Sequence, residues 1–331
     1  MTQINKLFIN TTWVCNMDCP RCYIPKTLRD DYYTAGLNVD YLSQTLKHTS
    51  IGQSNKTVAI YMGGEASAIS EKQLRTHMNV VTKELPDARH TIVTNLLNLP
   101  KWLITMSLKE FAGQIETTYA NGKKQTLSGS EYRYQKKFVR NLTAVTSAGI
   151  NCTVNVELNI ETIDAGIEPI INIMKESRAR DWAFDYSVDF DEFNYNPVYD
   201  EFDYPVLTGS ATLKEYWDFV NAIKQNEWVI NNKVRVAPRS DGFNVLEGKS
   251  FLTINANNTV TTNPLFSTMN ALQYSDINAI NQSKIRERHE RAAISRIRSC
   301  VGCNEFYDCQ GFSSHMPIQQ NGVCAGGLEC N

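Results

Sequence analysis

The sequence lacks the features that mark membrane, secreted and nucleic-acid-binding proteins. The 331-residue chain has no run of about 18 apolar residues, so no membrane span is predicted. Its first 25 residues lack the continuous apolar segment of a signal peptide. The net charge of −2 lacks the basic excess of a nucleic-acid binder, and no P-loop, GxGxxG or nucleophile-elbow motif occurs. We therefore expect a cytoplasmic protein with no membrane or nucleic-acid partner.

Cysteine, by contrast, is abundant, and eight of the nine cysteines fall into two groups. The groups are Cys15, Cys19 and Cys22 near the amino terminus and Cys300, Cys303, Cys309, Cys324 and Cys330 in the last 32 residues. An odd number of cysteines in a long chain without a secretion signal argues against a disulfide framework. Clustered thiolates in such a protein favour metal binding. The isolated Cys152 lies in a predicted strand, where we expect a small core side chain.

Strand-like and helical segments alternate over the first 225 residues. The strand-like runs are rich in Val, Ile, Thr and aromatic residues and cover 7–11, 58–62, 91–94, 114–119, 152–158 and 182–188. The helical segments cover 39–48, 71–85, 100–111, 131–147, 164–178 and 213–225. Ser70 and Gln73 form a capping box before the second helix, and Gly149 follows the fourth. This alternation predicts an α/β fold built on a parallel sheet.

Three later segments depart from this pattern. The stretch 184–205 holds eight aromatic residues and seven carboxylates, and it predicts either a packed surface loop or a lid beside a substrate. Residues 250–254 and 259–262 flank an Asn-rich turn and predict a β-hairpin. The stretch 284–298 predicts a helix with mixed Glu and Arg, which suits a solvated face or a docking surface for a redox donor.

The first cysteine group has the spacing C-x3-C-x2-C in the loop after the first strand. Three thiolates on so short a loop can converge on one metal centre. On a four-iron cube they leave one iron open, and an open metal position is where chemistry takes place. The alternatives are a structural zinc site, which normally needs four ligands, or a redox thiol pair.

This loop resembles the signature of the radical S-adenosylmethionine (SAM) superfamily, and the resemblance covers about residues 6–225. It implies a partial (β/α)6 TIM-like barrel. In that family Cys15, Cys19 and Cys22 would hold a [4Fe–4S] cluster whose open iron is chelated by SAM. Arg21 stands where the family usually has an aromatic residue that contacts adenine, and a guanidinium plane can also stack on a base. Tyr23 follows the third cysteine, as it often does in the family.

Further family motifs follow the later strands. Gly63, Gly64 and Glu65 resemble the segment that binds the SAM amino group, since glycines allow close approach and a carboxylate pairs with an ammonium. Thr94 and Asn95 resemble the family's TN pair. Thr118 stands where a Ser or Thr commonly contacts the SAM ribose or carboxylate, and Arg133 is expected to pair with the carboxylate. Glu157 and Asn159 are expected to reach the ribose. Each position from Thr94 onward equally suits a structural role in the barrel.

The second cysteine group resembles the SPASM and twitch extensions of this superfamily. Asn263 and Ser313 stand where the family places two cysteines of a first auxiliary cluster, so we expect that cluster to be absent. One auxiliary [4Fe–4S] cluster remains, bound by Cys300, Cys303, Cys309 and either Cys330 or Cys324. Without the upstream motif, zinc would be the first choice for this group. The predicted domains are a barrel over 1–230 and a small α+β auxiliary-cluster domain over 231–331.

The resemblance implies an enzyme of oxidoreductase or lyase type that reductively cleaves SAM to a 5′-deoxyadenosyl radical, which abstracts a substrate hydrogen. SPASM-type members commonly modify peptides, including precursors of ribosomally made natural products, by crosslinking, oxidation or backbone excision. The first strand begins near residue 7, so we expect a peptide substrate to need either a separate leader-peptide-binding protein or the barrel mouth with the loop at 184–205. The expected electron donor is flavodoxin or ferredoxin. The alternatives are a small-molecule epimerase or dehydrogenase with a twitch domain, and a zinc-binding module without turnover.

Overall fold

The computed structural model describes residues 4–20, 22–30, 36–48, 57–187, 211–238, 250–268 and 272–287, and near the carboxyl end 291, 294, 298, 300–303, 319–320 and 323–324. The strands are β1 (Lys6–Thr12), β2 (Val58–Gly63), β3 (Arg89–Ile92), β4 (Gln114–Tyr119), β5 (Asn151–Leu158), β6 (Asp181–Tyr186), β7 (Arg235–Pro238), β8 (Phe251–Ile254), β9 (Val260–Thr261), β10 (Gln319–Gln320) and β11 (Val323–Cys324). The six predicted strands correspond to β1–β6, with ends shifted by at most two residues.

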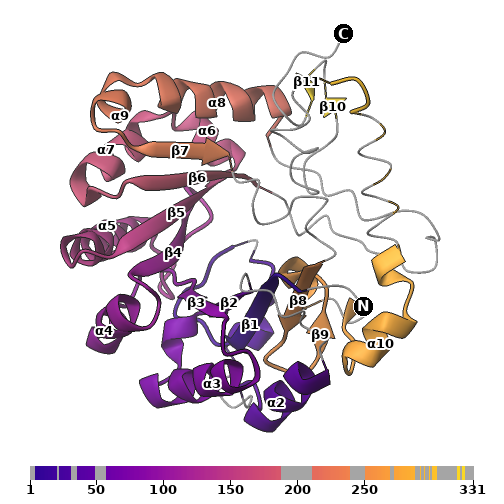
Figure 1. Cartoon of the computed structure of the whole chain (residues 1–331). Helices are drawn as coiled ribbons and strands as arrows, with labels where there is room; N and C mark the ends of the chain where they lie inside the picture. Colours follow the sequence, from indigo (N-terminus) through magenta and orange to yellow (C-terminus); the bar gives the residue numbers. More distant parts are fainter. Residues whose placement is uncertain are drawn as a thin grey trace.

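Two larger sheets carry most of these strands, in the orders β3-β2-β1-β8-β9 and β4-β5-β6-β7. All neighbours pair in parallel except β8 and β9. A bridge between Val93 and Glu116, with a 3.0 Å hydrogen bond from the Thr94 N–H to the Glu116 carbonyl, joins the two sheets next to β3 and β4. The strands thus follow one another around a single curved arc (Figure 1). An α/β fold with parallel sheets is confirmed, while the partial barrel of six βα units stays a prediction.

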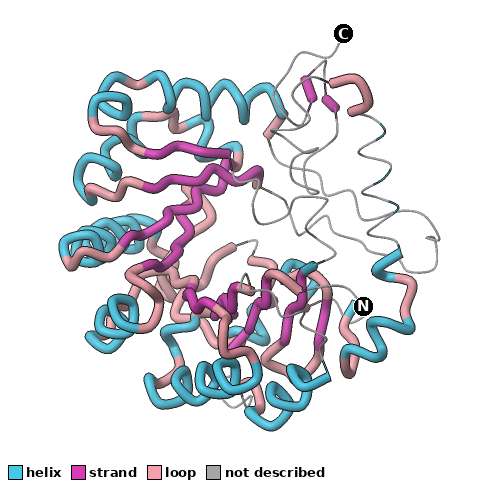
Figure 2. Tube along the Cα trace, viewed as in Figure 1, coloured by secondary structure: helices cyan, strands magenta, loops and turns pink. Residues whose placement is uncertain are grey.

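The helices are α1 (Lys26–Arg29), α2 (Val39–His48), α3 (Glu71–Glu84), α4 (Lys101–Lys109), α5 (Glu131–Ser147), α6 (Ile160–Asp164), α7 (Glu168–Ser177), α8 (Leu213–Gln225), α9 (Glu227–Asn231) and α10 (Ile277–Gln282), with the 3-10 turns η1 (Ala66–Ala68) and η3 (Pro264–Phe266). Helices α2 to α5 and α7 to α9 lie on the outer side of the arc of strands (Figure 2). The capping box of Ser70 and Gln73 is present on α3. The helix predicted over 164–178 is present as α7 but begins four residues later, because Gly166 has a φ of +74° and Pro169 lies at the start of α7; the short α6 before it was not predicted.

Alternate residues of each strand face the helices and form the main core. On β5 these are Cys152, Val154, Val156 and Leu158, each at most 1% exposed, which confirms Cys152 as a core side chain. The opposite face of β1, β2 and β8 carries a separate apolar cluster of Phe8, Ile60 and Phe251. Towards the carboxyl ends of the strands this inner face becomes polar, so ligand-binding side chains concentrate there.

The predicted hairpin at 250–262 is confirmed as β8 and β9, which pair antiparallel. Its first strand also pairs in parallel with β1, which the sequence did not indicate. The proposed boundary at 230/231 and a separate auxiliary domain stay predictions, and β7 and β8 beyond that boundary pair with β6 and β1.

Two further predictions fall partly outside the described residues. In the aromatic and acidic stretch 184–205, the residues from 188 onward lie outside the described part of the chain. In the 284–298 stretch, several positions lie outside it. In the 284–298 stretch, the described residues 285–287, 291, 294 and 298 are helical, and Glu287 pairs with Arg291 at 3.5 Å.

Within the residues that the structure covers, no helix is both long and apolar enough to cross a bilayer.

Candidate SAM and cluster site

The cysteine segment after β1 is held in shape by a buried arginine. Arg29 is 5% exposed and donates hydrogen bonds to the carbonyl oxygens of Ile24, Met17 and Cys19 at 3.0, 3.1 and 3.3 Å. Its own carbonyl accepts a hydrogen bond from the Cys15 N–H at 3.4 Å. These bonds close the segment 15–29 into a compact loop. Arg29 could not be identified from the sequence, since no motif distinguishes it from an exposed basic residue.

The three thiols lie within electrostatic range of one another. Cys15 is buried, while Cys19 and Cys22 are half-buried. Burial, with a smaller contribution from a nearby carboxylate, raises the pKa of the Cys15 thiol to about 12, and burial also raises the pKa of Cys22. Backbone N–H groups of Met17 and Ile24 act in the opposite direction. Buried thiols of this kind become thiolates when a cationic centre binds them and displaces their protons.

A cavity of about 410 Å³ opens beside this loop, within the size range of ligand sites. Its lining comprises Asp18, Cys19, Pro20, Cys22, Ile24, Pro25, Lys26, Arg29 and Gln125. Cys19 and Cys22 therefore face a space that a bound group can enter.

The two glycines at the end of β2 allow this strand to meet the cysteine segment. Gly63 has a φ of +138°, and a Cβ there would lie 2.2 Å from the Thr12 carbonyl oxygen. At Gly64 a Cβ would lie 2.1 Å from the Trp13 carbonyl oxygen. The Gly64 N–H donates to the Thr12 carbonyl at 2.9 Å. The close approach predicted for these glycines thus occurs between the end of β2 and the Thr12–Trp13 backbone, which leads into the cysteines.

Glu65 joins the ends of β2 and β3. Its carboxylate is 2% exposed. One oxygen accepts hydrogen bonds from the Ser67 N–H at 2.8 Å and the Thr94 hydroxyl at 2.7 Å, and the other accepts from the Asn95 N–H at 2.7 Å. The predicted GGE and TN motifs are therefore brought into direct contact. Binding of the SAM amino group by Glu65 stays a prediction.

Asn95 extends this network to the cysteines. Its side-chain N–H group donates to the Asn16 amide oxygen at 2.7 Å and lies 3.8 Å from the Cys15 sulfur. Its amide oxygen accepts from the Leu97 N–H at 2.8 Å, which fixes the orientation of the amide. A donor aimed at the Cys15 sulfur favours the thiolate.

The loop between β4 and α5 covers the other side of the cysteine segment. The Asp18 N–H donates to the Gln125 carbonyl at 3.2 Å, and the Gln125 side chain donates to the Asp18 carbonyl at 2.7 Å. Met17 and Thr126 continue this pairing as an antiparallel bridge. The loop therefore has a fixed position relative to the cysteines.

Lys124, next to Gln125, brings a cation to the site. Its side chain is 20% exposed, and its Nζ lies 3.5 Å from a carboxylate oxygen of Glu157 on β5. Burial alone lowers the pKa of Lys124, but Glu157 and the three cysteine thiolates raise it by more, so the net pKa lies above its usual value. Lys124 stays protonated beside the thiolates. The sequence analysis missed it, although a lysine pair in a short loop at the carboxyl end of a strand was an available signal.

Two other predicted positions have structural roles, and a third makes no contact with the cysteine loop. The Thr118 carbonyl accepts a hydrogen bond from the Tyr134 hydroxyl at 3.1 Å. Asn159 is fully buried, caps α6 through a 3.0 Å bond from the Thr162 N–H, and donates to a carbonyl of the β4–α5 loop at 2.7 Å. Arg133 lies in the first turn of α5 with its side chain exposed, and no contact with the cysteine loop is found among the described residues. Arg21 lies outside the described residues.

Tyr23 connects the cysteine segment to the region after β9. It packs in a small cluster with Trp13, Ile24 and Ala256, and its carbonyl accepts a hydrogen bond from the Thr268 hydroxyl at 2.8 Å. Burial raises its phenol pKa well above the usual range. Its predicted contact with SAM is not tested by these interactions.

The second cysteine group is described only in part. The Cys303 N–H donates to the Cys300 carbonyl at 3.1 Å, so these residues share one turn, and Cys324 lies on β11. Cys309 and Cys330 lie outside the described residues, as does Ser313. Asn263 is buried just before η3. The auxiliary ligand set therefore stays a prediction.

Comparison with known proteins gives no match to a family model or to a curated protein. Among solved structures, the chain is similar to native anSMEcpe with bound AdoMet and Kp18Cys peptide, with a TM-score of 0.67 at 16% identity over 98% of this chain and 92% of that chain. The chain has the radical SAM fold. The resemblance predicted from the cysteine loop is thereby confirmed at the level of the fold.

The radical SAM fold also relates the chain to Streptococcus suis SuiB. The structure of SuiB bound to S-adenosylmethionine matches with a TM-score of 0.55 at 11% identity, over 86% of this chain and 65% of that chain. SuiB bound to the precursor peptide SuiA matches with a TM-score of 0.54 at 12% identity, over 95% and 71%.

Proposed function

We propose that this chain is a radical SAM enzyme that modifies a peptide. The observation that carries the proposal is the hydrogen-bonded connection from Glu65 through Asn95 to Cys15, because it assembles three family motifs from three strands at one place. Similarity in fold to structures holding AdoMet and a peptide supports the same conclusion.

The cysteine segment fits a [4Fe–4S] cluster by the chemistry of its donors. Cys15, Cys19 and Cys22 supply three soft thiolate ligands, and N–H groups point at two of the sulfur atoms. With SAM bound at the open iron, such a cluster would supply the electron that cleaves SAM to a 5′-deoxyadenosyl radical.

The chain's own residues position SAM and keep water away from it. Gly63 and Gly64 let the end of β2 approach the Thr12 and Trp13 carbonyls, so the strand end that would bind the SAM amino group lies beside the backbone that leads into the cysteines. Lys124, protonated and held by Glu157, is placed to pair with the SAM carboxylate. Buried packing around Tyr23 limits access of water from the other side.

The substrate we propose is a precursor peptide, with a separate leader-peptide-binding protein as partner. The structures that share this fold were determined with Cp18Cys, Kp18Cys and SuiA peptides, and this supports a peptide substrate. The auxiliary [4Fe–4S] cluster at Cys300, Cys303, Cys309 and Cys324 or Cys330 would remove an electron from the substrate radical. Electron removal makes the net reaction an oxidation, such as crosslinking or dehydrogenation.

The test is co-expression with a short peptide encoded beside the gene, followed by mass spectrometry of the peptide. The expected product differs from the unmodified peptide by loss of two hydrogens or a backbone fragment, and deuterium placed on the peptide appears in 5′-deoxyadenosine. Deuterium transfer from a small sugar or alcohol and none from any peptide would refute the peptide assignment.

A further inference from the structure

Four basic side chains form one exposed face of α5. Arg133, Lys136, Lys137 and Arg140 have the spacing i, i+3, i+4 and i+7, which places them side by side on a helix. Glu131 is the one acidic residue of this helix, so α5 carries a positive charge on a chain whose net charge is −2. We call these four residues the α5 basic face.

The arrangement of these charges differs from that on the other surface helices. On α3, Glu71 pairs with Arg75 at 2.8 Å, and on α8, Lys214 pairs with Asp218 at 2.6 Å. On the α5 basic face, two i, i+4 pairs carry like charges, which destabilise a helix. None of the four has an ion-pair partner among the described residues. These exposed cations are therefore available to an acidic partner.

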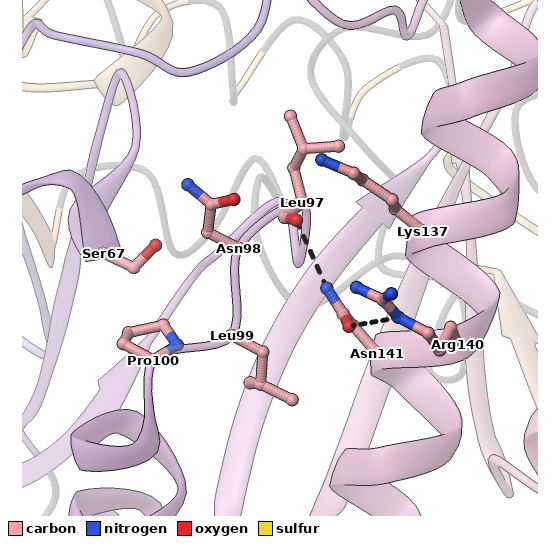
Figure 3. A pocket seen from close by; sticks show the side chains of 8 residues that line it. All are labelled: Ser67, Leu97, Asn98, Leu99, Pro100, Lys137, Arg140 and Asn141. Carbon is pink, nitrogen blue, oxygen red and sulfur yellow. Dashed lines mark hydrogen bonds between the residues drawn. The ribbon is translucent and has the colours of Figure 1, made fainter.

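A groove of about 390 Å³ lies beside Lys137 and Arg140 of the α5 basic face (Figure 3). Lys137 and Arg140 line one side, and Ser67 and Asn98 line the other. No carboxylate lines the groove. The Ser67 hydroxyl is buried and has no hydrogen-bond partner in the part of the chain that the structure describes. The groove thus offers several donors and two cations, a combination that suits carboxylates.

Both sides of the groove are attached to the cysteine site. Ser67 donates its N–H to Glu65, and Asn98 follows the Asn95 loop by three residues. α5 follows the loop whose Gln125 pairs with the cysteine segment. The groove is thus connected to Cys15 through the hydrogen bonds of Glu65 and Asn95.

We propose that the α5 basic face and its groove are the docking surface for an acidic electron-donor protein of the flavodoxin type. The inference rests on the proposed function, because reductive cleavage of SAM consumes one electron. The donor is oxidised by one electron, and the sulfonium of SAM, on accepting it, gives methionine and a carbon radical. Exposed, unpaired charges suit such a partner, since they steer a transient encounter and are screened by salt.

The 284–298 stretch, the other candidate docking surface in the sequence, is less suitable. It has six Lys or Arg residues, but Glu287 and Glu290 lie among them, and Glu287 pairs with Arg291 at 3.5 Å. Its cations therefore provide a matched control for charge reversal. The test compares the variant K136E/K137E/R140E with the control K284E/R291E/R298E, and a neutral variant K136Q/K137Q/R140Q covers the case in which charge reversal impairs folding.

The rate of 5′-deoxyadenosine formation is measured with dithionite and, separately, with enzymatically reduced recombinant flavodoxin. We expect equal rates for all proteins with dithionite and a loss of about tenfold or more for both α5 variants with flavodoxin. Binding of each protein to immobilised flavodoxin is measured at about 0.02 M and about 0.3 M salt. We expect binding by the wild type to weaken with salt, and both α5 variants to bind about tenfold more weakly than the control.

Equal losses with dithionite and flavodoxin would overturn the proposal, because the face would then support folding or SAM binding. Unchanged affinity of the α5 variants for flavodoxin would also overturn the proposal. If the same variants lost affinity for an acidic peptide instead, the face would bind a peptide and not the electron donor. If the wild type forms no 5′-deoxyadenosine with either reductant, the proposed function fails, and the binding measurement still decides whether this face binds the donor protein.

Discussion

At the scale of single residues, assembly of the site depends most on Glu65. Its buried carboxylate accepts three hydrogen bonds and connects two motifs that are 29 or more residues apart in the chain. Hydrogen bonds to a charged acceptor are stronger than neutral ones, and a buried donor left without its acceptor is costly.

The substitution Glu65→Gln places an amide donor opposite N–H or O–H donors. We expect the free energy of unfolding to fall by about 2 kcal/mol, measured by urea denaturation with tryptophan fluorescence. Glu71→Gln is the control, because the exposed Glu71–Arg75 pair should contribute less than about 0.5 kcal/mol. Equal effects of the two substitutions would show that the Glu65 network does not stabilise the fold.

Residues in motifs could be predicted from the sequence, but residues that act through packing could not. Glu65 and Asn95 follow strands at recognisable spacings, and the structure joins them. Arg29 and Lys124 gain their roles from the carbonyls and thiols that surround them in space, and no local pattern records those neighbours. Arg133 was the cation chosen from the sequence, yet the structure leaves it exposed and places Lys124 beside the thiolates.

At the scale of elements, the loop between β4 and α5 determines the charge of the site. Pairing of Gln125 with Asp18 fixes the loop, and Lys124 follows from that position. The substitution Lys124→Met should raise the KM for SAM about tenfold or more with a smaller change in kcat, because it removes a charge-assisted contact to the SAM carboxylate.

Lys124→Arg should retain most of the affinity for SAM, since it keeps the cation. Lys72→Met, at an exposed position on α3, is the matched control. An unchanged KM in Lys124→Met would exclude this residue from SAM binding.

A second prediction at this scale concerns α3 and the segment before α2. His77 on α3 is buried, and its Nε2 donates to the Leu37 carbonyl at 3.0 Å. Burial lowers the pKa of His77 below 6.5. The unfolded chain therefore binds a proton more readily, and the stability contribution present above pH 6.5 is lost as the pH falls through the folded pKa.

We expect the free energy of unfolding to decrease between pH 7.5 and pH 5.5, at about 1.4 kcal/mol per unit of pKa difference. The decrease should be smaller in His77→Gln. His48→Gln, at the exposed end of α2, is the control for loss of a histidine. An identical pH dependence in wild type and His77→Gln would contradict this account.

Element boundaries were predictable where local signals were strong. The run 114–119 coincides with β4, and the capping box marks the start of α3. The pairing of β8 with β1 could not be predicted, because it joins residues about 245 positions apart and no local pattern specifies the partner.

At the scale of the whole molecule, the two cysteine groups predict two clusters in one chain. Wild-type protein reconstituted under anaerobic conditions should contain about eight irons per chain, falling to about four in Cys300→Ala. Cys152→Ala, in the core of β5, should leave the iron content unchanged. A wild-type content near four that does not fall in Cys300→Ala would rule out the auxiliary cluster.

The central claim is that the cysteine segment supports reductive cleavage of SAM. The most direct measurement is 5′-deoxyadenosine formed by the anaerobic, reconstituted protein with SAM and dithionite, compared with the variant C15A/C19A/C22A. The account predicts 5′-deoxyadenosine and methionine in equal amounts from the wild type and none above background from the variant. Wild-type protein that holds zinc without sulfide and forms no 5′-deoxyadenosine would contradict it.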